Sequence, residues 1–346
     1  MKIFMAISLL SSSYLLANMN SKPSPKDRPY DYDLFSKDRE CEYIELEGLC
    51  LKMLNNVQIG AVSSTPNNFS SGASDPSAKL DTVNINFLWQ PGFRVTVGYF
   101  NAPKYWEVMG QYTWFQDKGN KTVTSPNASE DYLSLGGYYP LEPAATSGHL
   151  TKITGYSNLY YNDASVLATR NWYPNAHLRM RIYGGLTSLW THQTTNVYNT
   201  FSIATNTLNY AYRTKYWGVG FKMGTGADWY WGKDFYLTGK VFWSIVTGRW
   251  NTSTTVSSGG AMLYQPTDHY YLATQNFQFI FGPSYQKSYE KQRLEIFVGY
   301  EFNTWLDALT TYNYNAPTEA SSWTNPQSFY QDLVLTGVNI RLTLDF

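Results

Sequence analysis

The chain has 346 residues, of which 17% are aromatic and only 15% are charged. Lysine and arginine together number 26, as do aspartate and glutamate, so no net field draws the whole protein to nucleic acid, and we expect no such partner. After residues 1–17, no run approaches the roughly 18 uninterrupted apolar residues of a membrane-spanning helix. The composition therefore argues against a helical membrane protein and leaves two soluble domains or one barrel.

Residues 1–17 have the sequence MKIFMAISLLSSSYLLA, in which Lys2 precedes an apolar run and small residues that end at Ala17. Because the run is too short to span a bilayer, this order predicts a secretory signal peptide. A buried N-terminal strand or helix is the alternative.

Residues 18–53 are dense in charge and proline and show little alternation. We expect a periplasmic extension or a partly inserted plug, with a flexible leader as the alternative. This segment holds the two cysteines, Cys41 and Cys50. In an exported chain they could close a disulfide loop or pair between molecules, and their spacing is not the C-x-x-C of redox catalysis.

From residue 54 to residue 346 the dominant pattern has period two, as a strand with two different faces requires. The first long stripe, in DTVNINFLWQPGFRVTVGYF, comprises Val83, Ile85, Phe87, Trp89, Phe93, Val95, Val97 and Tyr99. The phase survives Pro91-Gly92, which predicts one long strand with a kink or bulge. Because Pro91 cannot donate a ladder hydrogen bond, a hairpin is the alternative.

The connections between stripes alternate in length. Short ones fall near 101–104, 172–175, 231–234 and 288–291, and long polar ones near 117–149, 192–208, 251–268 and 307–327. Tight turns at one rim and long loops at the other are typical of outer-membrane barrels.

The stripes from residue 80 onward make nine strands, and a single-chain barrel of this kind closes with an even number. We assign the tenth strand to 54–62, while a further pair around DYLSLGGYYPL would make twelve. The predicted fold is all-β, a transmembrane antiparallel β-barrel of about 10 strands (alternatively 12), with short periplasmic turns and long extracellular loops.

A soluble β-sandwich also alternates, but many stripes here carry rings near their ends, such as Trp89, Trp114, Trp190, Trp217 and Trp229. Such rings suit the interfacial girdles of a barrel. In lipid the sheet must close, because an open edge would leave backbone groups unpaired. The final strand, LTGVNIRLTLDF, keeps its apolar face up to Phe346, as a strand that closes a barrel would.

The segment FLWQPGFRVTVGYFNAPKYWEVMGQYTWF resembles the Legionella-type major outer membrane protein family, which includes chlamydia-like relatives. The match is carried by Trp89, Gly92, Phe93, Arg94, Val95, Gly98 and Tyr99, and weaker similarity covers most of residues 55–346. The resemblance implies a pore-forming barrel with a structural share in the bacterial outer membrane. It also implies that Phe346 is the assembly signal, read by the barrel assembly machinery.

If the apolar stripes face lipid, the residues of opposite parity face the lumen, and most strand charges have that parity. The candidate pore-lining residues are Arg94, Glu107, Arg179, Arg181, Lys222, Lys240, Arg293, Glu295, Glu301 and Arg341. Such a mixture of signs predicts a weakly selective, water-filled interior. The alternative is a set of structural ion pairs in a nearly closed barrel, because a ten-stranded lumen is narrow.

Catalysis has little support in the sequence, and we expect no enzyme, no cofactor and no metal, because the four histidines lack ligand spacing. Two weak candidates are Asp268 with His269, and Ser188 with His192. Adjacent residues, or residues four apart on a strand, rarely reach catalytic geometry.

Three functions remain in order of preference. The first is a diffusion pore for small hydrophilic solutes or ions that also has a structural role in the outer membrane. The second is a structural or adhesive surface barrel with an occluded lumen, and the third is a barrel hydrolase. The expected partners are outer-membrane lipid, the assembly machinery and the solutes, with a homo-oligomer as a further option.

Overall fold

The computed structural model describes residues 41–55, 57–64, 80–101, 105–127, 129–130, 132–135, 149–175, 177–203, 207–231, 234–259, 261–264, 267–288, 292–313 and 327–346. The predicted signal peptide and residues 18–40 lie outside this set. No helix in the described part is long and apolar enough to cross a membrane.

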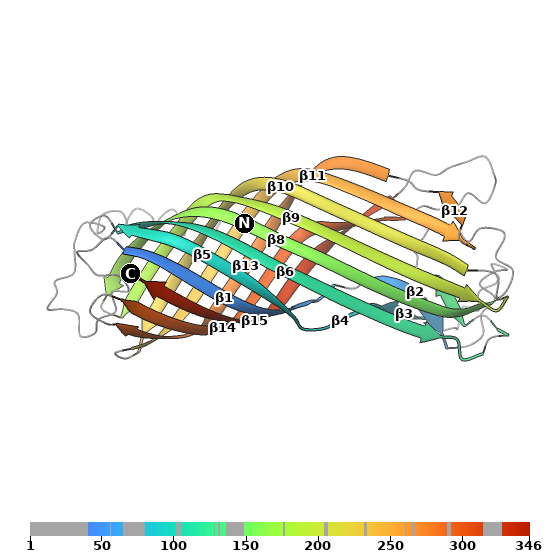
Figure 1. The fold of residues 1–346 in the computed structure, drawn as a ribbon, viewed down its shortest axis with the longest axis horizontal. Coiled ribbons are helices and arrows are strands. Elements are labelled where there is room, and N and C mark those ends of the chain that lie inside the picture. The colour runs from blue at the N-terminus through green and yellow to red at the C-terminus, as the bar shows by residue number, and fades with distance from the viewer. Residues whose placement is uncertain are drawn as a thin grey trace, which may run out of the picture.

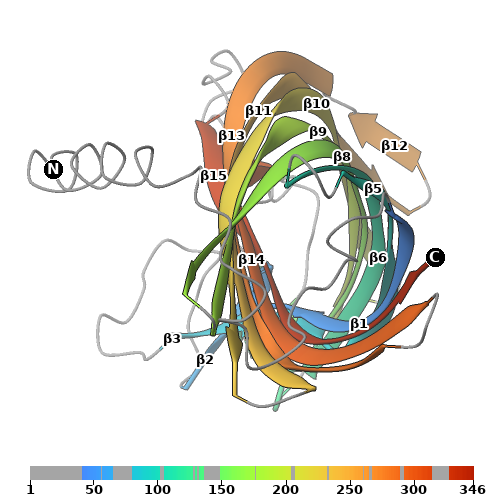
Figure 2. The ribbon, with the colours of Figure 1, turned by 90° about the vertical axis from the view of Figure 1, so that its left-hand side faces the viewer.

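Within the described residues, ten antiparallel strands form a closed ring (Figures 1 and 2). In order around the ring they are β1 (Cys41–Met53), β5 (Gln90–Asn101), β6 (Trp106–Thr124), β8 (Leu150–Asn175), β9 (Leu178–Phe201), β10 (Thr207–Tyr230), β11 (Phe235–Ser258), β13 (Thr267–Ser288), β14 (Arg293–Asn313) and β15 (Gln327–Asp345). Pairing of β1 with β15 closes the ring, and the predicted ten-stranded barrel is confirmed.

The remaining strands are short. β4 (Asn86–Phe87) pairs with β6, and β12 (Ala261–Tyr264) pairs with β11. β2 (Gln58–Ser63), β3 (Leu80–Asn84) and β7 (Leu133–Leu135) form a separate sheet, which we call the interior sheet.

The tenth strand of the wall is β1, at Cys41–Met53. The prediction that residues 54–62 form this strand was therefore wrong. Residues 58–63 belong to the interior sheet, and residues 41–53 of the expected extension belong to the wall. The reason lies in β1 itself, where Ile44 and Leu46 face outward while Glu45 and Glu47 face inward. This alternation was concealed by the charged composition around it.

The predicted single strand over 81–100 was also wrong. Val83, Ile85 and Phe87 are at most 5% exposed, whereas Phe93 and Val97 on β5 are 43% and 56% exposed. Alternation marks one apolar face without saying whether that face meets lipid or protein. Here the apolar residues before β5 pack against protein inside the barrel, and those on β5 face outward.

Short connections lie at one end of the ring and long ones at the other, as predicted, although two of the expected loops are mostly strand. β9 continues through Phe201 and β11 through Ser258, into the polar stretches 192–208 and 251–268. The outward positions there are polar because these strand ends extend past the apolar band. The loss of the stripe therefore marks the edge of the membrane and not the end of the strand.

Candidate functional site in the barrel lumen

The two faces of the wall strands divide as the sequence predicts. On β15 and at Phe346 directly after it, one set of alternate residues is exposed and the other is buried. Val338, Ile340, Leu342, Leu344 and Phe346 are 40–56% exposed, while Asn339, Arg341, Thr343 and Asp345 are 0–3% exposed. The apolar face therefore points outward and the polar face points into the lumen.

Tryptophans mark the limits of the outward apolar band. On β10, Trp217 and Trp229 are both exposed, with Val219, Phe221 and Met223 between them on the same face. The twelve-residue separation gives about 40 Å along the strand, or about 28 Å at a tilt of about 45°. This height agrees with the roughly 25 Å apolar band of outer-membrane barrels.

All ten candidate pore-lining residues lie on inward positions, and most are paired. Arg94 on β5 donates to Glu47 at 2.7 Å and to Glu301 at 2.6 and 3.0 Å. Glu301 also accepts a hydrogen bond from Gln278 at 2.6 Å. Since β5 and β14 are separated in the ring by β1 and β15, this pairing spans part of the lumen.

A second set of ion pairs lies on β14 and β15, toward the short-turn end. Arg341 donates to Glu295 at 2.7 Å, and Arg293 donates to Glu295 at 3.0 Å and also to Asp345. Arg341 additionally lies 3.9 Å from Glu47 on β1. These side chains are no more than 6% exposed.

A third set lies across the ring on β8 to β11. Asp228 accepts hydrogen bonds from Arg179 and, at 2.8 Å each, from Arg181 and Thr238. Lys222 lies 3.4 Å from Asp163. A buried carboxylate that receives two guanidinium groups is satisfied by protein and needs no water.

Glu107 and Lys240 line a small cavity between these sets. The cavity has a volume of about 20 Å³ and is lined by Glu45, Glu47, Glu107, Met109, Gln111, Leu167, Arg181, Tyr183, Lys240, Phe242, Gln278 and Ile280. Glu107 also accepts a hydrogen bond from the Tyr43 hydroxyl. About one water molecule fits such a volume.

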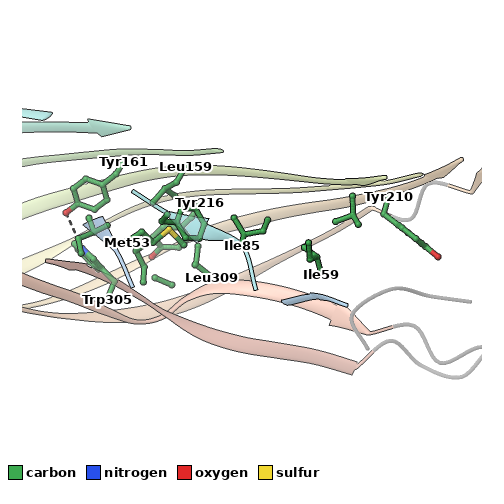
Figure 3. Packing of buried hydrophobic residues seen from close by; sticks show 14 of the residues in the cluster. Met53, Ile59, Ile85, Leu159, Tyr161, Tyr210, Tyr216, Trp305 and Leu309 are labelled. Carbon is green, nitrogen blue, oxygen red and sulfur yellow. Dashed lines mark hydrogen bonds between the residues drawn. The ribbon is translucent and has the colours of Figure 1, made fainter. Parts of the chain in front are cut away.

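The lumen is also bridged by direct contact between opposite walls. The Trp305 indole N–H donates to the Tyr161 hydroxyl at 3.1 Å (Figure 3). β8 and β14, which carry these residues, are five positions apart in the ring of ten and so face one another. A contact of this kind occupies the centre of the lumen.

Beyond this bridge, toward the long loops, the interior contains a large apolar cluster. Ile59 of the interior sheet and Ile85 beside it belong to a buried cluster with Met53, Leu159 and Tyr216 (Figure 3). Inward-facing glycines make room for them: a Cβ at Gly119 would lie 2.6 Å from Ile85, and one at Gly155 would lie 2.8 Å from Ile59. The interior sheet thus packs on the inner face of β6 and β8.

The site contains residues that the sequence analysis did not select. Glu45 and Glu47 were missed because β1 was assigned to the extension, although their alternation with Ile44 and Leu46 was a usable signal. Tyr161 was missed because nothing in a sequence says which strands face each other across a ring.

The two cysteines cannot form a disulfide within the chain. Both lie on β1, nine residues apart, and are free thiols. An extended strand separates such positions by about 30 Å, whereas disulfides need Cα atoms about 4.4 to 6.8 Å apart. The proposed intrachain loop was therefore wrong, and pairing between molecules stays a prediction.

The hydrogen bonds of the catalytic candidates involve backbone groups or a threonine hydroxyl. Ser188 donates to the Gly218 carbonyl at 2.8 Å, and the His192 imidazole lies 3.2 Å from the Thr194 hydroxyl. Asp268 accepts the backbone N–H of His269 at 2.7 Å. Within the described residues, no three His, Cys, Asp or Glu side chains gather as a metal site.

A closed ring of antiparallel strands, an apolar outer band between aromatic rows and an inward charge network define a transmembrane β-barrel of the bacterial outer membrane. The model of one protein family, described as Legionella pneumophila major outer membrane protein precursor, matches residues 43–346. The chain belongs to this family, which confirms the resemblance found in the sequence. No curated protein matches the chain.

Several solved outer-membrane proteins are similar to a low degree. The outer membrane protease OmpT from Escherichia coli is 10% identical, with a TM-score of 0.40, 88% of this chain covered and 96% of that one. OprG from Pseudomonas aeruginosa is 9% identical, with a TM-score of 0.31 and coverage of 89% and 99%. The toluene transporter TodX of P. putida is 7% identical, with a TM-score of 0.29 and coverage of 90% and 91%. Because the sequence identities and TM-scores are this low, the three similarities support no conclusion about this chain.

Proposed function

We propose that this protein is a structural barrel of the outer membrane whose lumen is closed at rest. The observation that carries the proposal is the contact between Tyr161 and Trp305 from opposite walls, together with the paired charges beside it. A water-filled pore would leave these groups hydrated. Among the functions considered from sequence, the geometry therefore favours the occluded barrel over the diffusion pore.

A diffusion pore for small hydrophilic solutes is the second candidate, and one observation favours it. The interior sheet pairs its strands with each other and not with the wall. It can therefore leave the lumen without breaking a wall hydrogen bond. In that function the protein would conduct only after the interior sheet moved and the charge network rearranged.

The experiment is solute-driven swelling of lipid vesicles that contain the purified full-length protein. We expect a disaccharide to enter no faster than into protein-free vesicles. The double variant Tyr161→Ala plus Trp305→Ala should speed entry, because it removes the bridge. Rapid entry with the wild-type protein would overturn the closed barrel and favour the pore.

No hydrolytic activity is part of the proposal. The hydroxyl of Ser188 donates to the Gly218 carbonyl, and the carboxylate of Asp268 accepts the backbone N–H of His269. An activity screen with peptide and ester substrates should therefore find no turnover. Turnover that disappears in His192→Ala or His269→Ala would contradict this reading.

A further inference from the structure

The outer surface carries exposed positive charge just beyond the aromatic row on the long-loop side. Trp190 and Trp217 are paired in register and end the apolar band there. Arg249 on β11 is exposed and in register with Trp217. Lys215 and Arg213 follow on the same outward face of β10, at the next two outward positions, and both are exposed. We call Arg213, Lys215 and Arg249 the basic rim.

The spacing within the basic rim suits shared binding of phosphate groups. Outward residues two apart on a strand are about 7 Å apart, and diagonal neighbours on paired strands are about 7 to 8 Å apart. Arg213 and Lys215 have the first relationship, and Lys215 and Arg249 have the second. Long basic side chains at this spacing can converge on one phosphorylated group.

No acidic side chain in the described residues pairs with the basic rim. None of the ion pairs in the described structure includes Arg213, Lys215 or Arg249. The flanking outward positions are Thr194, Asn251 and Ser253. The exposed acid of the neighbouring strand, Asp268, has inward parity and accepts the His269 backbone amide.

The pKa of His192 is affected by the same local excess of positive charge. His192 lies in register with Lys215, beyond the membrane band, and stacks on Tyr160 with ring centroids 6.0 Å apart. Its pKa is lowered, first by partial burial and then by the charges of Lys215 and Arg213. An acid nearby would have the opposite effect on this imidazole.

From the position and charge of the basic rim, we propose that it binds the phosphorylated headgroup of an outer-leaflet lipid. Such a lipid would lay its acyl chains on the apolar face at Val219 and Phe221, which begins directly below Trp217. Its phosphates would then sit at the level of Arg249, Lys215 and Arg213. Charge complementarity and continuity with the lipid-facing band select a lipid over a soluble anion.

The test is equilibrium binding of a fluorescent diphosphorylated lipid A to the full-length barrel in neutral detergent. The variant Lys215→Gln plus Arg249→Gln should weaken binding by about tenfold or more and reduce its dependence on salt. The matched control is Arg170→Gln plus Lys287→Gln, which removes two exposed outward charges near the short-turn rim. The control should bind as the wild type does.

Folding of each variant is checked by its heat-dependent mobility on gels. If charge is the cause, the charge-conserving variant Lys215→Arg should bind as the wild type does, whereas Lys215→Gln should bind more weakly. Equal losses in the basic-rim variant and the control would overturn the proposal. So would equal binding of lipid A without phosphates, or displacement by inorganic phosphate at the concentration of the lipid. A changed oligomeric state with unchanged lipid affinity would assign the basic rim to a protein partner and also overturn it.

Discussion

The buried ion pair of Arg94 and Glu301 gives a quantitative prediction about the lumen. Both side chains are at most 2% exposed, and their nearest atoms are 2.6 Å apart. Two unit charges about 4 Å apart interact by about 4 kcal/mol at an effective dielectric constant near 20, but by about 1 kcal/mol in water. The coupling between these residues therefore reports whether the lumen is dry.

Arg94→Met should lower the free energy of unfolding by about 3 to 5 kcal/mol, because it leaves the buried carboxylates of Glu47 and Glu301 without their main partner. Glu301→Gln removes one of these charges and keeps an acceptor for Gln278. In that background Arg94→Met should cost about 2 kcal/mol less, which is the coupling energy of the pair.

The assay is reversible urea unfolding in lipid vesicles, followed by tryptophan fluorescence, for the wild type, both single variants and the double variant. Arg170→Met, on the exposed outer face, is the control and should cost at most about 1 kcal/mol. A coupling energy below about 0.5 kcal/mol would refute the reasoning, because only a hydrated lumen screens the pair that strongly.

Three further predictions test other parts of the fold. In the same unfolding assay, Leu342→Arg should lower the free energy of unfolding by about 2 to 4 kcal/mol. Asn120→Arg, at an outward position beyond the apolar band, should lower it by about 0 to 1 kcal/mol. Equal losses would refute the assigned position of the band. Gly155→Val should displace the interior sheet and cost about 1 to 3 kcal/mol with faster proteolysis there, unlike Gly184→Val, whose site is open within 4 Å. Asp117 lies inside the barrel beyond the apolar band, and burial raises its pKa from 3.8 to about 6. The folded protein therefore favours the protonated carboxyl, whose contribution to the free energy of unfolding is full below about pH 4 and is lost as the pH rises through 6. Asp117→Asn should thus be more stable than the wild type at pH 7 by up to about 3 kcal/mol and nearly equal at pH 4, and parallel pH profiles would contradict this.

The sequence predicted the wall of the barrel well because lipid imposes a simple rule on it. Outward positions between the aromatic rows are mainly apolar, and the backbone must be paired throughout. The stripe of β15 from Val338 to Phe346 follows this rule and has the predicted facing. The inward parity of the charged residues follows from the same alternation.

The interior was less predictable, for two physical reasons. Ile85 and Phe93 have the same pattern, although the first packs against protein and the second faces lipid, since the hydrophobic effect does not distinguish the two. The partners of a lumen charge also depend on ring order: Arg94 reaches Glu301 only because β1 closes the ring between β5 and β15. Once β1 was misassigned, the partners of Arg94 could not be predicted, although a nearly closed barrel was among the alternatives.

The proposal that the lumen is closed at rest is tested most directly by the conductance of the purified full-length wild-type protein in planar lipid bilayers. The contact of Tyr161 with Trp305 joins opposite walls of the ring, and the charges of Arg94, Glu47 and Glu301 beside it are paired within the protein. We therefore predict a bilayer that stays electrically tight at high protein load. The double variant Tyr161→Ala plus Trp305→Ala should introduce leakage and so demonstrate that protein has inserted. Reproducible unitary current steps from the wild-type protein, at low applied voltage, would contradict the account.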